Sequence, residues 1–178
     1  GEAVFTSGAT MALNIIIKGM FHQGDHVLTT TLEHNSVLRP LYEIEKKGVQ
    51  LDFISFNEEG IINIEELTKK IKPNTSNVLG TYQPIKEIST IAHEYQILVI
   101  IDAAQAVGHC VIDMEKLGID ILCFSGHKGL RTPRGIGAIV MKEPFNISPL
   151  LSGGSGFLSL EKEQPSTLPE SLEAGTLP

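Results

Sequence analysis

The stretch Ile97-Leu98-Val99-Ile100-Ile101-Asp102 decides the fold class of this chain. Its five apolar residues do not alternate with polar ones, which is typical of a strand that is covered on both faces. Strands of this kind form parallel sheets between two layers of helices. The carboxylate of Asp102, which follows directly, would be costly at this position without a cationic partner. We therefore expect a three-layer α/β domain with a mostly parallel sheet and a polar site where this strand ends.

Strand-like and helical segments alternate on both sides of this stretch. We expect strands at residues 3–6, 26–30, 49–55, 97–101, 119–124 and 137–141, and helices at 9–20, 63–71, 84–95 and 114–117, with one more that follows residues 32–36 and ends near Gly48. Residues 152–178 are rich in Gly, Ser, Pro and Glu, which indicates a loop or linker outside the core. The expected organisation is a large domain over residues 1–151 and a linker over 152–178, truncated at both ends.

Composition excludes several classes of function. The chain has 178 residues and a formal net charge of −7, and its scattered Lys and Arg residues are not typical of nucleic-acid binding. No apolar run has the length of a membrane span and no signal-peptide pattern is seen, so we expect a cytoplasmic location and no membrane partner. Cys110 and Cys123 have no metal-binding spacing. We expect two buried free thiols and no metal site.

Four polar clusters each follow a predicted strand, so we expect them at the same edge of the sheet. The first, residues 6–10 (Thr-Ser-Gly-Ala-Thr), breaks a strand and opens a helix. Free N–H groups at a helix start favour a phosphate, although such residues are also ordinary helix caps. The second cluster, residues 32–36, contains His34. Its imidazole could stack on an aromatic ring or move protons, and the alternative is an exposed loop histidine.

The third cluster, residues 102–105, contains Asp102 and Gln105. A protonated pyridine nitrogen would be a cationic partner for Asp102, and Gln105 could bind a phenolate oxygen on the same ring. The alternative is an aspartate that caps the following helix.

The fourth cluster, residues 125–128, contains Ser125, His127 and Lys128 between flanking glycines. A lysine in a cofactor pocket can form a Schiff base with an aldehyde, and Ser125 and His127 could bind a phosphate. A surface lysine is the alternative for Lys128 alone. Taken together, the four clusters predict a site for pyridoxal 5'-phosphate (PLP).

The runs at residues 6–10, 32–36, 101–105 and 125–128 resemble the class V aminotransferase group of fold-type I PLP enzymes, and within it the cysteine desulfurases and selenocysteine lyases. The resemblance covers essentially the whole chain and implies the large PLP-binding domain of that fold. It assigns the phosphate to Ala9, Thr10, Ser125 and His127, the ring face to His34, the pyridine nitrogen to Asp102, the phenolate oxygen to Gln105 and the Schiff base to Lys128. Asn77 matches an asparagine near the ring, and Thr176 matches a threonine that reaches the phosphate of the neighbouring subunit.

The resemblance also implies a reaction. A cysteine desulfurase converts L-cysteine to L-alanine and passes the sulfur to an acceptor cysteine, with Lys128 and His34 as the catalytic residues here. It implies a homodimer and a possible sulfur-acceptor protein. The alternatives are a selenocysteine lyase acting on L-selenocysteine, another class V aminotransferase or lyase, and a catalytically inert fragment that retains the fold.

Three departures from the family pattern accompany this resemblance. About eight to ten residues, enough for a strand and its turn, are absent between Thr75 and Ser76. The sheet should therefore contain a gap or be repaired, which puts the position of Asn77 in doubt. The small C-terminal domain, with its substrate-binding arginine and sulfur-accepting cysteine, is also absent, and so is the N-terminal segment. Neither Cys110 nor Cys123 matches that cysteine.

Overall fold

The computed structural model describes residues 1–80, 84–154, 156 and 162–175. The strands are β1 (Glu2–Thr6), β2 (His26–Thr30), β3 (Gln50–Ile54), β4 (Thr75–Gly80), β5 (Val99–Asp102), β6 (Ile121–Ser125) and β7 (Gly137–Met141). The helices are α1 (Ala9–Met20), α2 (Asn35–Glu45), α3 (Ile64–Lys70), α4 (Ile85–Glu94) and α5 (Met114–Leu117). All the predicted helices and strands are present, and most boundaries shift by one to three residues.

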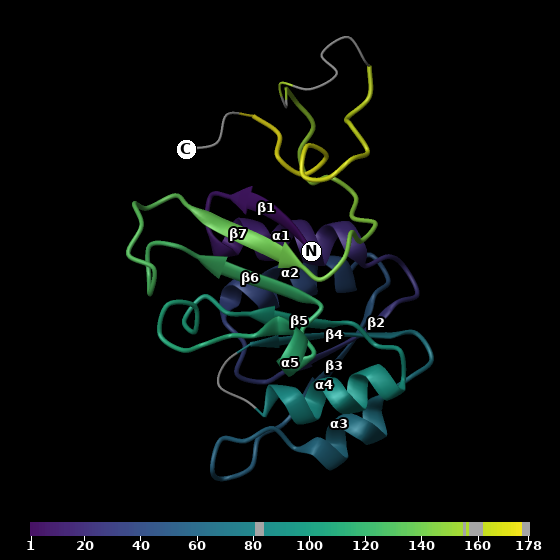
Figure 1. Ribbon diagram of the computed structural model, residues 1–178. Helices are drawn as coiled ribbons and strands as arrows, with labels where there is room; N and C mark the ends of the chain where they lie inside the picture. The colour runs from purple at the N-terminus through teal and green to yellow at the C-terminus, as the bar shows by residue number, and fades with distance from the viewer. Residues whose placement is uncertain (81–83, 155, 157–161, 176–178) are drawn as a thin grey trace.

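Within the described residues the strands form one sheet in the order β1-β7-β6-β5-β4-β2-β3 (Figure 1). Strand β7 is antiparallel to β1 and β6, and the other neighbouring pairs are parallel. The predicted mostly parallel sheet is therefore confirmed. Strands β1, β2, β5 and β6 all end at the same edge, which is where the four polar clusters begin.

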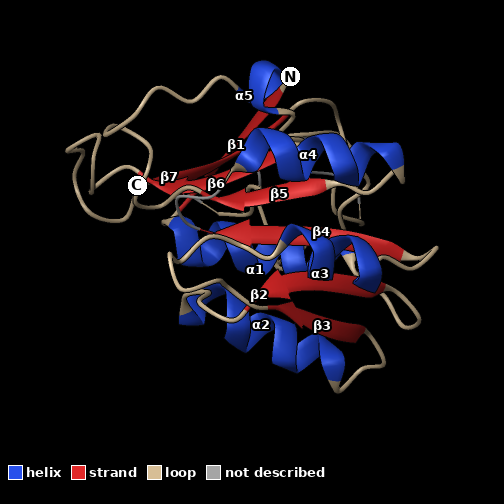
Figure 2. Cartoon of the chain, turned by 90° about the horizontal axis from the view of Figure 1, so that it is seen from below, coloured by secondary structure: helices blue, strands red, loops and turns tan. Residues whose placement is uncertain are grey.

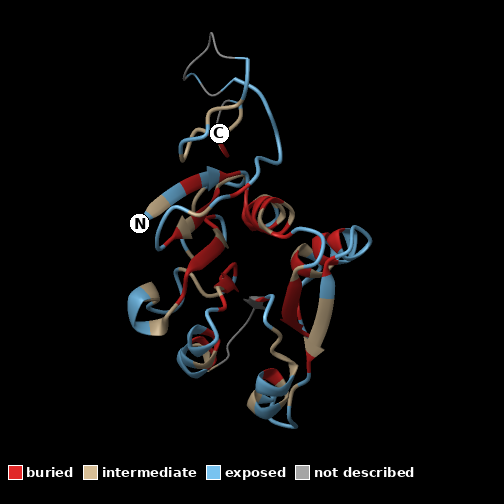
Figure 3. Cartoon of the chain, turned by 90° about the vertical axis from the view of Figure 1, so that its right-hand side faces the viewer, coloured by how far each residue is buried: buried red, intermediate tan, exposed pale blue. Residues whose placement is uncertain are grey.

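Helices cover both faces of this sheet (Figures 1 and 2). Helices α1 and α2 bury one apolar core against it, and α3 and α4 bury a second core on the opposite face. In β5, Ile100 belongs to the first core, whereas Val99 and Ile101 belong to the second. Both faces of β5 are thus buried, which explains its unbroken apolar sequence. Figure 3 shows the buried residues concentrated between the two helical layers.

The sheet is repaired at the place where residues are absent from the family pattern. The sequence analysis expects no strand at residues 75–80, but Thr75–Gly80 forms β4 between β2 and β5. Thr75 pairs with His26, and Gly80 pairs with Asp102. Without β4, the inner edges of β2 and β5 would leave backbone N–H and C=O groups unpaired. Pairing of those groups favours a strand in a segment whose polar side chains do not predict one.

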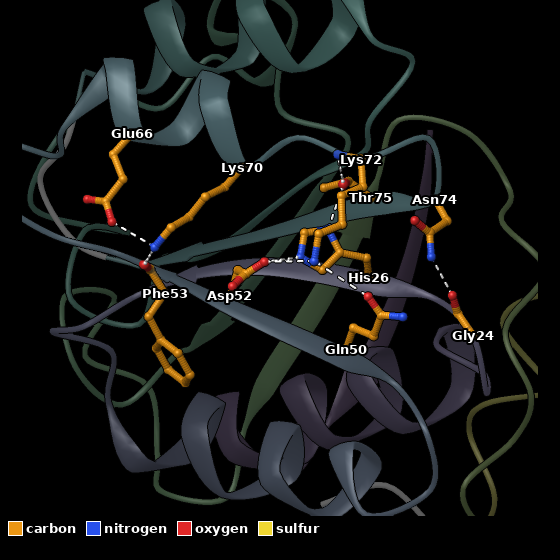
Figure 4. Close-up of polar contacts among 10 residues, drawn as sticks. All are labelled: Gly24, His26, Gln50, Asp52, Phe53, Glu66, Lys70, Lys72, Asn74 and Thr75. Carbon is orange, nitrogen blue, oxygen red and sulfur yellow. Dashed lines mark hydrogen bonds and ion pairs between the residues drawn. The ribbon is translucent and has the colours of Figure 1, made fainter.

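Side chains from β2, β3 and the start of β4 form a partly buried polar cluster around His26 (Figure 4). His26 is 0% exposed, and its Nδ1 lies 2.7 Å from Thr75 Oγ1 while its Nε2 lies 2.9 Å from Asp52 Oδ2. The backbone N–H of Lys72 donates to Thr75 Oγ1 at 2.7 Å, and Lys72 Nζ lies 2.9 Å from Asp52 Oδ2. These four residues, His26, Asp52, Lys72 and Thr75, are called the amino-edge cluster below.

One arrangement of hydrogens gives each hydrogen bond of the amino-edge cluster one donor and one acceptor. A neutral His26 donates from Nε2 to Asp52 and accepts the Thr75 hydroxyl hydrogen at Nδ1. Burial lowers the pKa of His26, although the hydrogen bond to Asp52 opposes it. The hydrogen bond from Lys72 holds the pKa of Asp52 below its usual value. The cluster therefore binds the first residue of β4 to β2 and β3.

The chain after β7 packs back onto the sheet near its amino-terminal strand. Leu172 is buried in the core beneath α1, so the prediction that residues 152–178 lie outside the core is wrong at this position. The Phe5 N–H, on strand β1, donates to Glu173 Oε1 at 2.6 Å. The segment contains no helix or strand among its described residues.

Candidate active site

A cavity of about 570 Å³ opens at the carboxyl edge of the sheet. It is bounded by the first turn of α1, the start of α2 and the segments that follow β5 and β6. Eight of the ten predicted site residues line it: Ala9, Thr10, His34, Asp102, Gln105, Ser125, His127 and Lys128. The structure thus brings together side chains from all four polar clusters.

Asp102 is the partly buried acid of this cavity. Its Oδ1 accepts the Ala104 N–H at 2.9 Å, so the alternative of a capping aspartate is correct for one oxygen. Its Oδ2 has no hydrogen-bond partner among the described residues. Burial raises the pKa of Asp102, and the hydrogen bond from Ala104 and the electrostatic influence of the nearby Lys128 and His34 oppose this only in part. A buried carboxyl group with an open oxygen fits a cationic ligand that donates a hydrogen bond.

Lys128 follows β6 in a turn whose backbone is closely packed. A Cβ atom on Gly129 would lie 2.1 Å from the Val107 carbonyl oxygen, and one on Gly108 would lie 2.3 Å from the Gly129 carbonyl carbon. The glycine after Lys128 is therefore needed for contact between the two loops that border the cavity. Lys128 itself is exposed and makes no hydrogen bond or ion pair with a described residue.

The start of α1 is built by a glycine and a serine from another strand. Gly8 adopts φ +132, a conformation that a residue with a side chain rarely takes. The N–H of Ala9 donates to Ser125 Oγ at 2.8 Å, which ties α1 to the end of β6. The Ser125 hydroxyl keeps its own hydrogen available for a ligand. The dipole of α1 adds to this preference for an anion.

His34 is the N-cap of α2, because its Nδ1 accepts the backbone N–H of Ser36 at 3.1 Å. The Ser36 hydroxyl lies 2.9 Å from the same nitrogen and 2.9 Å from Thr10 Oγ1. Ser36 lines the cavity and is missed by the sequence prediction. Only its position two residues after His34 could have indicated it, since Thr10 lies 26 residues away.

The remaining two predicted residues are Thr176 and Asn77. Thr176 lies outside the described residues. The register of β4 sets Asn77 opposite Val99, three residues before Gly80, which is the partner of Asp102. Three residues of strand span about 10 Å, so the backbone of Asn77 lies well away from the carboxyl edge. The assignment of Asn77 to the cofactor ring stays a prediction, because its side chain lies outside the described part of the structure.

The two cysteines differ in their surroundings. Cys123 is buried, and burial raises the pKa of its thiol, with the charge of Asp102 adding to the effect. It is therefore not a candidate thiolate. Cys110 is exposed and lines the cavity, so the prediction of two buried thiols is wrong for Cys110. The turn that follows β5 brings it to the surface.

Two further findings concern the described part of the chain. It contains no group of three His, Cys, Asp or Glu side chains that could hold a metal ion. No helix in it has the length and apolar character needed to cross a membrane.

The family model for class-V aminotransferases matches residues 1–178. The chain belongs to the class-V aminotransferase family. The cysteine desulfurase IscS of Dictyoglomus turgidum is 37% identical over 166 residues, which cover 86% of this chain and 42% of that protein. PLP is the cofactor that this family generally implies.

Solved structures agree with this class-V fold. The apo cysteine desulfurase from Thermococcus onnurineus NA1 has a TM-score of 0.88 at 34% identity, with 99% of this chain and 48% of that chain covered. The structure of SspA in complex with cysteine has a TM-score of 0.79 at 31% identity, with 86% and 48% covered. The three-layer α/β fold predicted from the sequence is confirmed. The class-V chain spans less than half the length of these relatives.

Proposed function

We propose that this chain is the cofactor-binding part of a PLP-dependent cysteine desulfurase. The observation that carries the proposal is the meeting of Lys128, Asp102 and His34 at one cavity, from three segments far apart in the sequence. The named relatives support cysteine as the substrate, because they are cysteine desulfurases or, in one case, bind cysteine. The products would be L-alanine and sulfur bound to an acceptor cysteine.

The described side chains fit PLP chemically. The open oxygen of Asp102 would accept the N–H of a protonated pyridine ring, and its raised pKa would then fall towards the ordinary range. The Ser125 hydroxyl, with Thr10 and His127, would hold the phosphate beside the start of α1. Gln105 is exposed at the cavity and is available to the phenolate oxygen.

The cofactor, when bound, supplies an electron sink for the substrate's α-carbon. Asp102 would keep the ring nitrogen protonated, which is the condition for that sink. Lys128 would hold the cofactor through its amine, and the same amine would move the α-proton. His34 lies against one side of the cavity, where its ring would cover the cofactor face and exclude water.

The sulfur-accepting part of the reaction has no matching residue in this chain. Cys123 is buried beside Asp102, and Cys110 does not match the accepting cysteine of the family pattern. The proposal therefore assigns that step to a cysteine outside these 178 residues. The match of Thr176 to a family threonine that reaches the phosphate of the neighbouring subunit supports a homodimer.

The test is to locate the cofactor covalently. The protein is incubated with PLP and reduced with borohydride, and mass spectrometry identifies the lysine that carries the pyridoxyl group. We expect the label on Lys128, its loss in K128A and its retention in K72A, a lysine of the amino-edge cluster. A label on another lysine, or none in folded protein, would contradict the proposal.

A second assay then separates desulfurase from selenocysteine lyase. Unreduced protein loaded with PLP is supplied with L-cysteine or L-selenocysteine, together with an added thiol that accepts the sulfur or selenium, and alanine is measured in each case. We expect alanine from L-cysteine. Alanine from L-selenocysteine alone would favour the lyase. No product from either substrate, when a separate reduced sample carries the label on Lys128, would indicate an inert cofactor-binding domain.

A further inference from the structure

Two hydroxyl groups link helix α1 to the imidazole of His34. Thr10 Oγ1 lies 2.9 Å from Ser36 Oγ, which lies 2.9 Å from His34 Nδ1. Thr10 belongs to the first turn of α1, and His34 is the N-cap of α2. The contact therefore joins the starts of two helices that pack against each other on one face of the sheet. All three side chains line the cavity.

The backbone N–H of Ser36 determines the direction of the hydrogen bonds among Thr10, Ser36 and His34. The N–H of Ser36 donates to His34 Nδ1 at 3.1 Å, and a ring nitrogen that accepts a hydrogen bond carries no hydrogen of its own. The Ser36 hydroxyl must then donate to the same nitrogen. Its oxygen is left to accept, so the Thr10 hydroxyl donates to Ser36. Thr10 thus donates a hydrogen bond to Ser36, and Ser36 donates one to His34.

We propose that Ser36 is a positioning residue, which holds His34 in the tautomer with its hydrogen on Nε2. Two donors, one from the backbone and one from the hydroxyl, converge on Nδ1 and fix both the tautomer and the orientation of the ring. Nε2 has no hydrogen-bond partner among the described residues. The ring nitrogen that remains free therefore presents an N–H group and not a lone pair.

This inference rests on the proposed function, because the tautomer matters to the reaction only if His34 lies against the cofactor. In that position the ring donates a hydrogen bond from Nε2. To act as a base it would take up a proton at Nδ1, which would break the contacts with both donors. Ser36 thus assigns His34 the role of a hydrogen-bond donor and leaves proton removal to Lys128.

The test measures the tautomer directly in cofactor-free protein. Histidine is labelled with ¹⁵N, and the His34 ring signals are identified by their absence in H34Q. Spectra are recorded over a pH series that extends to about 8.5, and the tautomer ratio is read where the ring signals no longer change with pH. In the unmodified protein we expect Nδ1 to show the shift of an unprotonated nitrogen. Removing one hydrogen bond in S36A should lower the ratio of the Nε2–H to the Nδ1–H tautomer roughly fivefold.

Two further variants control for disturbance of the fold. S36T keeps a hydroxyl at the same position and should restore the ratio of the unmodified protein. T10V removes only the donor to Ser36 and should leave the ratio nearly unchanged. An unchanged ratio in S36A, or no recovery in S36T, would overturn the proposal. Since no cofactor is present, either outcome is distinct from a failure of PLP to label Lys128.

Discussion

The two edges of the sheet carry the same kinds of side chain. Those at the amino edge are hydrogen-bonded to one another, whereas those at the carboxyl edge are partly unpaired. At the amino edge, His26 and Asp52 are paired with each other, and Lys72 and Thr75 complete the cluster. At the carboxyl edge, Asp102 retains an open oxygen, and Lys128 has no hydrogen bond or ion pair with a described residue. Hydrogen bonding lowers the pKa of Asp52, whereas burial raises that of Asp102. A histidine and an aspartate stabilise the fold where they are satisfied, and they indicate a binding site where they are not.

The largest expected effect separates the roles of the two aspartates. D102N keeps the shape of the side chain and removes its charge, so the rate of alanine formation from L-cysteine should fall about 10²–10³-fold. The folded state raises the pKa of Asp102, so its ionised form destabilises the fold at neutral pH. The free energy of unfolding of D102N in urea should therefore be unchanged or higher. A clear loss of stability would show that Asp102 is a structural residue like Asp52.

A substitution at the amino edge should have the opposite effect, lowering the stability of the fold while leaving cofactor binding intact. H26A removes a side chain that is 0% exposed and leaves Asp52 and Thr75 without their shared partner. We expect the free energy of unfolding to fall by about 2–4 kcal/mol, as measured by urea denaturation. Borohydride labelling of Lys128 should persist under conditions where H26A remains folded. Loss of the label in folded protein would show that the two edges are coupled.

The smallest expected effect is a pH dependence of stability that belongs to the amino edge. Burial lowers the pKa of His26 below 6.5 in the folded state, so on acidification the unfolded chain binds this proton first. Stability should be full above about pH 6.5 and fall as the pH drops towards the folded-state pKa, by at most about 1.4 kcal/mol per pH unit. The contribution of Asp52 is lost only below its ordinary value of 3.8. Urea unfolding of H26Q should show a shallower slope in the His26 range, and an equal slope would contradict the assignment.

Part of the fold is predictable because some strands of the core are nearly unbroken apolar runs. Strands β5 and β7 follow this rule, and helix α3 begins within one residue of its predicted start, with Asn63 as its N-cap. Strand β4 does not, since its residues Thr75, Ser76 and Asn77 have polar side chains. It becomes a strand because β2 and β5 need a partner, and that requirement is visible only in three dimensions.

The candidate site was predictable to a similar degree and for a related reason. Parallel strands bring their carboxyl ends together, so Asp102 and Lys128 could be placed at one edge from the sequence alone. Ser36 could not, because its importance depends on a contact with Thr10 across 26 residues. The exposure of Cys110 could not be predicted either, since it depends on the path of the turn after β5.

The hydrogen bond from Phe5 to Glu173 has a consequence for the solubility of the protein. Strand β1 is the last strand on its side of the sheet, and its outward N–H groups could pair with a strand of another molecule. At Phe5 a carboxylate from the chain's own later segment takes that hydrogen bond and places a negative charge against the edge. The segment after β7, whose composition is that of a simple connector, thus helps to shield the sheet from aggregation.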